Sequence, residues 1–180
     1  MNTLYTLGYT GAKPEQILKL VQDLGALVVD CRYSPRSRAV QWTGAGFRRL
    51  LGESYLHLPS LGNINYKGDG PIQINKPAEG VPQVIRLLDQ QPVILLCVCA
   101  ECETCHRKVV AELVQAASGC AVQHLNRAEI SAPSPTSTSQ PAALFPQADF
   151  SAAPLPRPTD AGGQLTLSSK ALPLHQLKMF

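Results

Sequence analysis

Short apolar runs alternate with amphipathic helical segments along residues 1–128, and this alternation constrains the fold more than any other feature of the chain. The apolar runs have the length and composition of buried strands, and they lie at residues 4–8, 26–30, 55–58, 93–97 and 121–125. Apolar stripes indicate helices over residues 14–24, 44–51 and 107–117, with a further helix opened by Pro82. Strands separated by short helices are typical of a parallel sheet with right-handed crossovers. The sequence therefore predicts an α/β fold, a single domain with a mostly parallel sheet of about five strands flanked by helices.

The composition changes near residue 130. Residues 129–180 are rich in Pro, Ser and Ala, and the last fifty residues carry eight of the fifteen prolines. Such a segment buries too little apolar surface to offset the entropy lost on ordering it. We therefore expect an α/β domain at 1–128, followed at 129–180 by a flexible low-complexity tail that is largely disordered or loosely docked.

The charge balance and the lack of long apolar runs narrow the class of protein. Sixteen basic and thirteen acidic residues give a net charge of +3, too small to indicate nucleic-acid binding by bulk charge alone. No apolar run approaches the ~18 residues that cross a bilayer, and the first residues do not resemble a secretion signal. We therefore expect no membrane partner and a cytoplasmic location, where the six cysteines are reduced thiols or metal ligands.

Reactive and charged side chains follow the predicted strands at the points where the strands end. Because the carboxyl ends of parallel strands meet at one edge of a sheet, these side chains predict a ligand site at that edge. The candidate catalytic residues are Cys97, Cys99, Cys105, His106 and His57. The candidate substrate-binding residues are Gly8, Tyr9, Asp30, Arg32, Ser37 and Arg107.

Four cysteines lie within nine residues, at Cys97, Cys99, Cys102 and Cys105. In one interpretation a thiol is nucleophilic or redox-active, because a helix that starts after Cys105 lowers the pKa of nearby thiols. In a second, the four thiols bind zinc or an iron–sulfur cluster, although no second Cys-x2-Cys pair exists to supply ligands. In a third, cysteines simply pack as small apolar side chains, the interpretation favoured for Cys120.

Several arginines follow the second predicted strand. Arg36 and Arg38 lie in a loop with two serines, where a solvated basic surface is the usual explanation. Asp30 and Arg32, by contrast, lie at the end of a buried strand, where a charge needs a partner or a function. We therefore expect a local anion site, with phosphate as a candidate ligand and Asp30 as a group that holds Arg32 in place.

Together these motifs resemble a known protein family. Thr6-Leu-Gly-Tyr-Thr-Gly11, the segments 28–37 and 57–63, and the segment 95–99 followed by 105–111 are similar to domain of unknown function 488. The resemblance covers about residues 3–125 and implies a compact bacterial α/β domain with a motif-lined cleft, while leaving its activity open. Cys102 lies outside the family pattern, which weakens a metal site that needs all four thiols. The matching positions are Gly8, Asp30, Arg32, Pro35, Ser37, His57, Leu61, Gly62, Cys97, Cys99, Cys105, His106 and Arg107.

Two hypotheses of function follow. In the first, the domain carries out thiol-dependent chemistry on an anionic substrate that bears phosphate or contains sulfur. Cys105 or Cys97 is then the nucleophile or redox thiol, and Cys99 is a resolving thiol. The proton carrier is a histidine and the oxygen-binding groups are arginines, namely His106 or His57, and Arg32 with Arg107. In the second, the domain is a noncatalytic module for nucleotide or nucleic acid, whose cysteine cluster is structural or binds metal.

Overall fold

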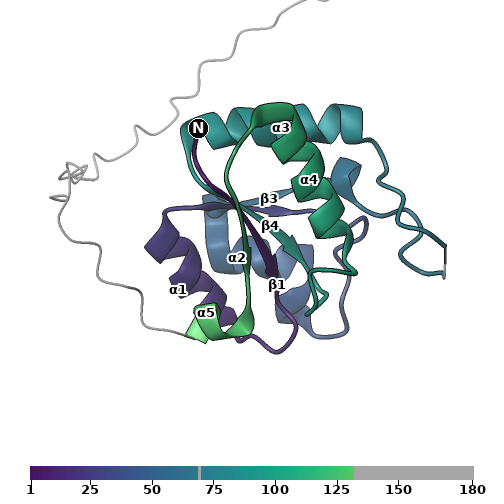
Figure 1. The fold of residues 1–180 in the computed structure, drawn as a ribbon. Helices are drawn as coiled ribbons and strands as arrows, with labels where there is room; N and C mark the ends of the chain where they lie inside the picture. Colours follow the sequence, from purple (N-terminus) through teal and green to yellow (C-terminus); the bar gives the residue numbers. More distant parts are fainter. Residues whose placement is uncertain (69, 132–180) are drawn as a thin grey trace, which may run out of the picture. The chain divides into compact units, whose positions relative to one another are not determined.

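Five parallel strands form the centre of the structure, a computed structural model that describes residues 1–68 and 70–131 (Figure 1). The strand order across the sheet is β3-β2-β4-β1-β5, and every strand pair is parallel. This arrangement confirms the predicted single α/β domain with a five-stranded parallel sheet. The strands are β1 (Leu4–Gly8), β2 (Leu27–Asp30), β3 (Tyr55–His57), β4 (Val93–Cys97) and β5 (Val122–Leu125).

The register of the strands aligns their carboxyl ends. Gly8 at the end of β1 is paired with Cys97 at the end of β4. Asp30 at the end of β2 is paired with Leu96 on one side and with His57 on the other. Residues from four different strands are therefore brought to one edge of the sheet.

Helices cover both faces of the sheet (Figure 1). On one face, α3 (Pro77–Gln90) and α4 (His106–Ser118) bury a core that includes Val84, Leu88, Val110 and Val114. On the other, α1 (Pro14–Leu24), α2 (Gly44–Leu51) and the short α5 (Arg127–Ser131) bury a second core that includes Ile17, Val21, Phe47 and Ile130.

The central strands are apolar on both faces because helices cover both. All residues of β2 and β4 are buried. Along β4, Leu95 packs in the core beneath α3 and α4, whereas Ile94 and Leu96 pack in the opposite core. The continuous apolar runs in the sequence are thus strands buried on two sides.

Helix α3 begins five residues before the predicted start. Pro77, rather than Pro82, occupies the first turn, and Pro82 lies inside the helix on its exposed side. A proline inside a helix has no N–H to donate to the carbonyl four residues earlier, which is why a start at Pro82 was expected. Here Gly80 is buried against Leu61, and this packing draws the preceding turn into the helix.

The predicted boundary at residue 128 falls within α5, which was not predicted. Apart from residues 129–131, the predicted tail lies outside the described residues. Within the described part of the chain, no helix is long and apolar enough to cross a membrane.

Candidate functional site

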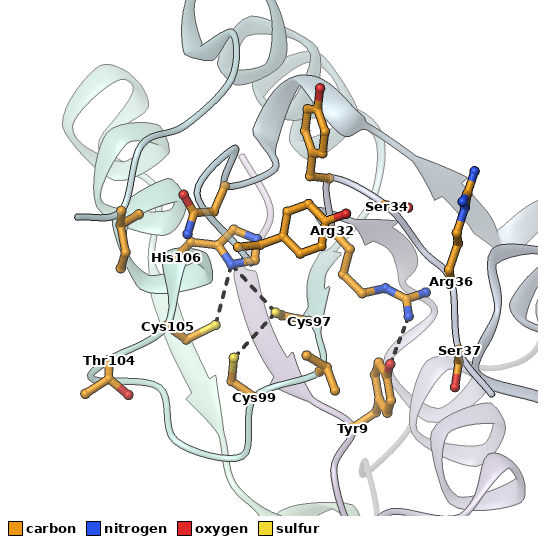
Figure 2. A pocket seen from close by; sticks show the side chains of 15 residues that line it. Tyr9, Arg32, Ser34, Arg36, Ser37, Cys97, Cys99, Thr104, Cys105 and His106 are labelled. Atoms are coloured by element: carbon orange, nitrogen blue, oxygen red, sulfur yellow. Dashed lines mark hydrogen bonds between the residues drawn. The ribbon is translucent and has the colours of Figure 1, made fainter. Parts of the chain in front are cut away.

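A pocket of about 380 Å³ lies at the carboxyl edge of the sheet (Figure 2). Tyr9 follows β1, Arg32 follows β2, and Cys97 ends β4. The other lining residues come from the loops after β2 and β4, from the loop before α3 and from the first residue of α4: Tyr33, Ser34, Arg36, Ser37, Asn63, Tyr66, Ile72, Val98, Cys99, Thr104, Cys105 and His106. Eight of the residues named as candidates from the sequence therefore line this one pocket: Tyr9, Arg32, Ser37, Cys97, Cys99, Cys105, His106 and the loop arginine Arg36.

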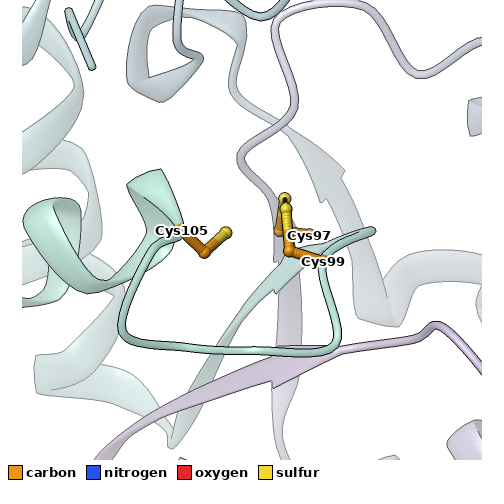
Figure 3. A group of neighbouring side chains, drawn as sticks. All are labelled: Cys97, Cys99 and Cys105. Atoms are coloured by element: carbon orange, nitrogen blue, oxygen red, sulfur yellow. Dashed lines mark hydrogen bonds between the residues drawn. The ribbon is translucent and has the colours of Figure 1, made fainter. Parts of the chain in front are cut away.

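Three of the cysteines form a tight cluster in the pocket (Figure 3). The Sγ atoms of Cys97, Cys99 and Cys105 all lie within 4.8 Å of one another, and those of Cys97 and Cys99 are 3.9 Å apart. Cys97 ends β4, Cys99 lies in the following loop, and Cys105 precedes the first residue of α4. Cys97 and Cys105 are buried, each 2% exposed, whereas Cys99 is half-buried. Cys99 is thus the most accessible thiol of the three.

His106 directs one ring nitrogen at the thiols. Its Nδ1 lies 3.7 Å from the Sγ of Cys97 and 3.8 Å from the Sγ of Cys105 (Figure 2). Its Nε2 lies 2.9 Å from the carbonyl oxygen of Cys31, which can only accept, so Nε2 carries a proton. This hydrogen bond orients the ring and leaves Nδ1 to interact with the cluster.

The contacts within the cluster shift the pKa values of the thiols and of His106 in different directions. Hydrogen bonds from Cys105 and Cys97 lower the pKa of Cys99 to about 2. Hydrogen bonds with Cys97 and Cys99 raise the pKa of Cys105. The pKa of Cys97 is lowered by a hydrogen bond with Cys105, but a hydrogen bond with Cys99 and burial outweigh this and raise the pKa to about 12. Burial opposes charge on His106, yet hydrogen bonds with Cys105 and Cys31 raise its pKa to about 11. The directions of these shifts favour a thiolate on Cys99 and a protonated His106 in the same pocket.

Arg107 holds the cysteine loop in place and does not line the thiol pocket. Its guanidinium donates to the carbonyl oxygens of Cys99, at 2.6 Å, and Ala100, at 3.1 Å, and its side chain is buried. A Cβ at Gly8 would lie 1.7 Å from the same Cys99 carbonyl oxygen, so only glycine lets the loop approach β1. Gly8 and Arg107 therefore position the thiols, and binding of substrate by these two residues stays a prediction.

Asp30 and Arg32 form a buried ion pair beside the pocket. The Nε of Arg32 donates to Asp30 at 2.8 Å, and its Nη2 donates to the other carboxylate oxygen at 2.5 Å. Tyr55 donates its hydroxyl to Asp30, while Nη1 of Arg32 donates to Tyr9 and to the carbonyl of Trp42. Asp30 thus holds Arg32, as expected. Most of the donors of Arg32 are occupied by protein atoms, so its predicted binding of substrate anions is not what this geometry favours.

His57 lies apart from the thiols. Its Nε2 is 2.9 Å from the carbonyl oxygen of Arg32, and its side chain lines a neighbouring cavity formed with Pro35 and Thr43. The structure therefore brings His106, and not His57, to the cysteine cluster.

Cys102 is also separated from the cluster. Its Sγ lies 3.3 Å from Nδ1 of His124, and it lines a different cavity together with Arg107. Of the four thiols considered as one metal site, the structure thus groups three: Cys97, Cys99 and Cys105. Cys120 is buried, as the packing interpretation expects, and Cys31 is buried as well.

The entrance of the pocket carries groups that the sequence did not single out. Tyr33 and Tyr66 are exposed, their ring centroids lie 5.8 Å apart, and both line the pocket with Ile72. The sequence feature that could have identified them is the occurrence of two aromatic residues in otherwise polar loops.

Arg36 lines the same pocket, and within the described residues it has no ion-pair or hydrogen-bond partner. It is therefore the pocket cation available to an anionic ligand.

The cluster also has the donor set of a thiophilic metal ion. Ligand sulfurs around a tetrahedral zinc ion with Zn–S bonds of about 2.3 Å lie about 3.8 Å apart. The 3.9 Å between the sulfurs of Cys97 and Cys99 fits this separation, and the third thiol lies within 4.8 Å of both. A ligating histidine usually donates its second ring N–H to a carbonyl, as His106 does to Cys31.

Comparisons with protein-family models, with curated proteins and with solved structures find no match to this chain.

Proposed function

We propose that the domain carries out thiol-dependent chemistry on a small anionic substrate bound in the pocket at the carboxyl edge of the sheet. The observation that carries this proposal is the shared pocket of three adjacent thiols, one imidazole and an arginine that has no ion-pair or hydrogen-bond partner among the described residues. A soft nucleophile, a proton carrier and an anion-binding group are the parts that such chemistry requires.

The proposal assigns the nucleophile to Cys99. All three thiols line the pocket, but Cys99 is the least buried of them, whereas Cys97 and Cys105 are each 2% exposed. The buried thiols donate hydrogen bonds that hold the negative charge on Cys99. This differs from the sequence hypothesis, in which Cys105 or Cys97 attacked and Cys99 resolved, because burial could not be assigned within the motif.

The remaining roles go to His106 and Arg36. His106 carries a proton beside the thiols and lines the pocket, so it can protonate a leaving group. Arg36 supplies positive charge, and the hydroxyls of Ser34, Ser37 and Thr104 add hydrogen-bond donors around the same volume. A phosphate-bearing or sulfur-containing anion suits this set of groups.

Alkylation of the reduced full chain tests the proposal. Iodoacetate is anionic and iodoacetamide is neutral, so the ratio of their rates at one thiol reports local positive charge. We expect Cys99 to react faster than free cysteine at pH 7, with the labelled residue identified by peptide mass spectrometry. Cys99→Ser should abolish this reaction, and Cys120→Ser, which removes a buried thiol outside the pocket, should leave it unchanged.

Two neighbouring arginines provide a matched pair for the anion-binding part. Arg36→Gln should lower the preference of Cys99 for iodoacetate, whereas Arg38→Gln, which changes a residue outside the pocket lining, should not. The proposal is contradicted if Cys97, Cys99 and Cys105 all react no faster than free cysteine.

The sulfur geometry favours a second candidate function, a noncatalytic binding module whose cysteines hold a metal. Metal and acid-labile sulfide content of protein purified without oxygen distinguishes the two. Stoichiometric zinc, or iron with sulfide, that is lost in Cys97→Ser and kept in Cys102→Ser would favour the metal site. A folded, metal-free protein would favour free thiol chemistry.

A further inference from the structure

A second group of reactive side chains lies on the other side of the cysteine loop. The Sγ of Cys102 is 3.3 Å from Nδ1 of His124 and 3.7 Å from Oγ1 of Thr6. The same Thr6 oxygen is 2.9 Å from Nδ1 of His124. A thiol, an imidazole nitrogen and a hydroxyl thus form a closed triangle of polar contacts.

The topology of the sheet places these three residues together. Thr6 on β1 and His124 on β5 are direct partners in the parallel register, so their side chains project from the same face. Thr6 is fully buried, Cys102 is half-buried and His124 is exposed. A buried hydroxyl needs hydrogen-bond partners, and Thr6 obtains them from this histidine and this thiol.

We infer that Cys102, His124 and Thr6 form a second reactive thiol site, which is oxidised by hydrogen peroxide or a small organic hydroperoxide. The site does not depend on the function proposed for the three-thiol pocket. It opens into a separate cavity of about 690 Å³, so a small oxidant reaches the sulfur without entering that pocket.

The triangle supplies the proton transfers that the oxidation requires. The thiol proton of Cys102 passes to Nδ1 of His124, which leaves a thiolate beside an imidazolium. The imidazolium then donates to the oxygen of Thr6, whose own hydroxyl hydrogen is directed to the thiolate.

The oxidation step balances with hydrogen peroxide as the named oxidant. The thiolate attacks one peroxide oxygen, an S–O bond forms and the O–O bond breaks. Sulfur loses two electrons, and the leaving hydroxide takes the proton from His124 and becomes water. The product is a sulfenic acid on Cys102.

The test measures sulfenic acid formation at each cysteine of the full reduced chain. Substoichiometric hydrogen peroxide is added at pH 7 without oxygen, dimedone traps the sulfenic acid, and peptide mass spectrometry gives the rate at each site. We expect Cys102 to be labelled faster than N-acetylcysteine. His124→Gln should slow this labelling by about tenfold or more, because the proton acceptor is lost, and Thr6→Val should slow it to a lesser extent.

Two controls make the result specific. Gln123→Ala changes the residue beside His124 on β5. Because it removes no group of the site, the labelling rate at Cys102 should stay within about twofold of the rate in the unchanged chain. Labelling of the buried Cys120 reports any unfolding of a variant. In the Cys99→Ser background the reaction at Cys102 should persist. Labelling of Cys102 no faster than N-acetylcysteine, or a rate unchanged in His124→Gln, overturns the inference and leaves the proposal for the pocket untouched.

Discussion

At the scale of single residues, Gly8 shows how the lack of a side chain shapes the thiol site. A Cβ at this position would lie 1.7 Å from the carbonyl oxygen of Cys99 and 2.9 Å from Nη1 of Arg107. Gly8→Ala must therefore displace the cysteine loop, and we expect it to lower the free energy of unfolding by about 1–3 kcal/mol. Gly68→Ala is the matched control, since nothing lies within 4 Å of its Cβ position. Urea denaturation measures both, and equal stabilities would contradict the prediction.

Asp30 is a buried charge whose removal leaves Arg32 unpaired. It accepts hydrogen bonds from the Nε and Nη2 of Arg32 and from the hydroxyl of Tyr55. We expect Asp30→Asn to lower the free energy of unfolding by about 3–5 kcal/mol, because a buried guanidinium then lacks its counter-charge. Asp23→Asn, which breaks the exposed pair with Lys19, should cost less than about 1 kcal/mol. Similar losses of unfolding free energy in the two variants would show that the buried ion pair contributes no more to stability than the exposed pair.

Tyr55 couples stability to alkaline pH. Burial and the neighbouring Asp30 carboxylate raise its pKa above the ordinary value of 10.0. The folded state thus retains a proton that the unfolded state releases, so the contribution is complete below pH 10 and is lost as the pH rises above it. We expect the free energy of unfolding to fall above pH 10. Tyr55→Phe should remove that part of the slope and the exposed Tyr66→Phe should retain it, measured by urea denaturation from pH 8 to 11.

At the scale of elements, the loop between β4 and α4 depends on Arg107. The Arg107 side chain is buried, and its Nη1 and Nη2 donate to the successive carbonyl oxygens of Cys99 and Ala100. A lysine keeps the charge but cannot supply the planar pair of donors. We expect Arg107→Lys to lower the free energy of unfolding by about 1.5–3 kcal/mol. Arg86→Lys, on the exposed side of α3, should change it by less than about 0.5 kcal/mol; equal effects would argue against a special role for Arg107.

Most elements could be predicted from the sequence, because their signals are local. The apolar runs identified all five strands, and the stripe ending at Gly25 identified α1, whose C-cap glycine has the left-handed conformation. The start of α3 was predicted wrongly, since Pro82 is a strong local signal for a helix start and the packing of Gly80 on Leu61 is not local. The short α5 lacks an apolar stripe long enough to recognise.

At the scale of the whole molecule, the middle strand of the sheet, β4, ends at the thiol cluster. β4 is hydrogen-bonded on both sides and fully buried, whereas β5 is an edge strand with exposed residues. We expect amide hydrogen exchange to be slowest in β4 and considerably faster in β5, because central strands open only with the whole domain. Exchange followed by mass spectrometry measures this, and comparable protection of the two strands would conflict with the strand order.

The sequence by itself determined the α/β class, the strands and the edge of the sheet where reactive groups gather, because periodicity and strand ends are properties of neighbouring residues. Only the tertiary structure decided which groups meet. It joined Cys97, Cys99 and Cys105 with His106, directed Cys102 to His124, and left His57 in another cavity. It also engaged Arg107 with the cysteine loop and, among the residues that the structure describes, left Arg36 in the pocket without an ion-pair or hydrogen-bond partner. The physical reason is the strand order: β4 lies between β2 and β1, and β5 beyond β1, so the two sides of one loop face different strands.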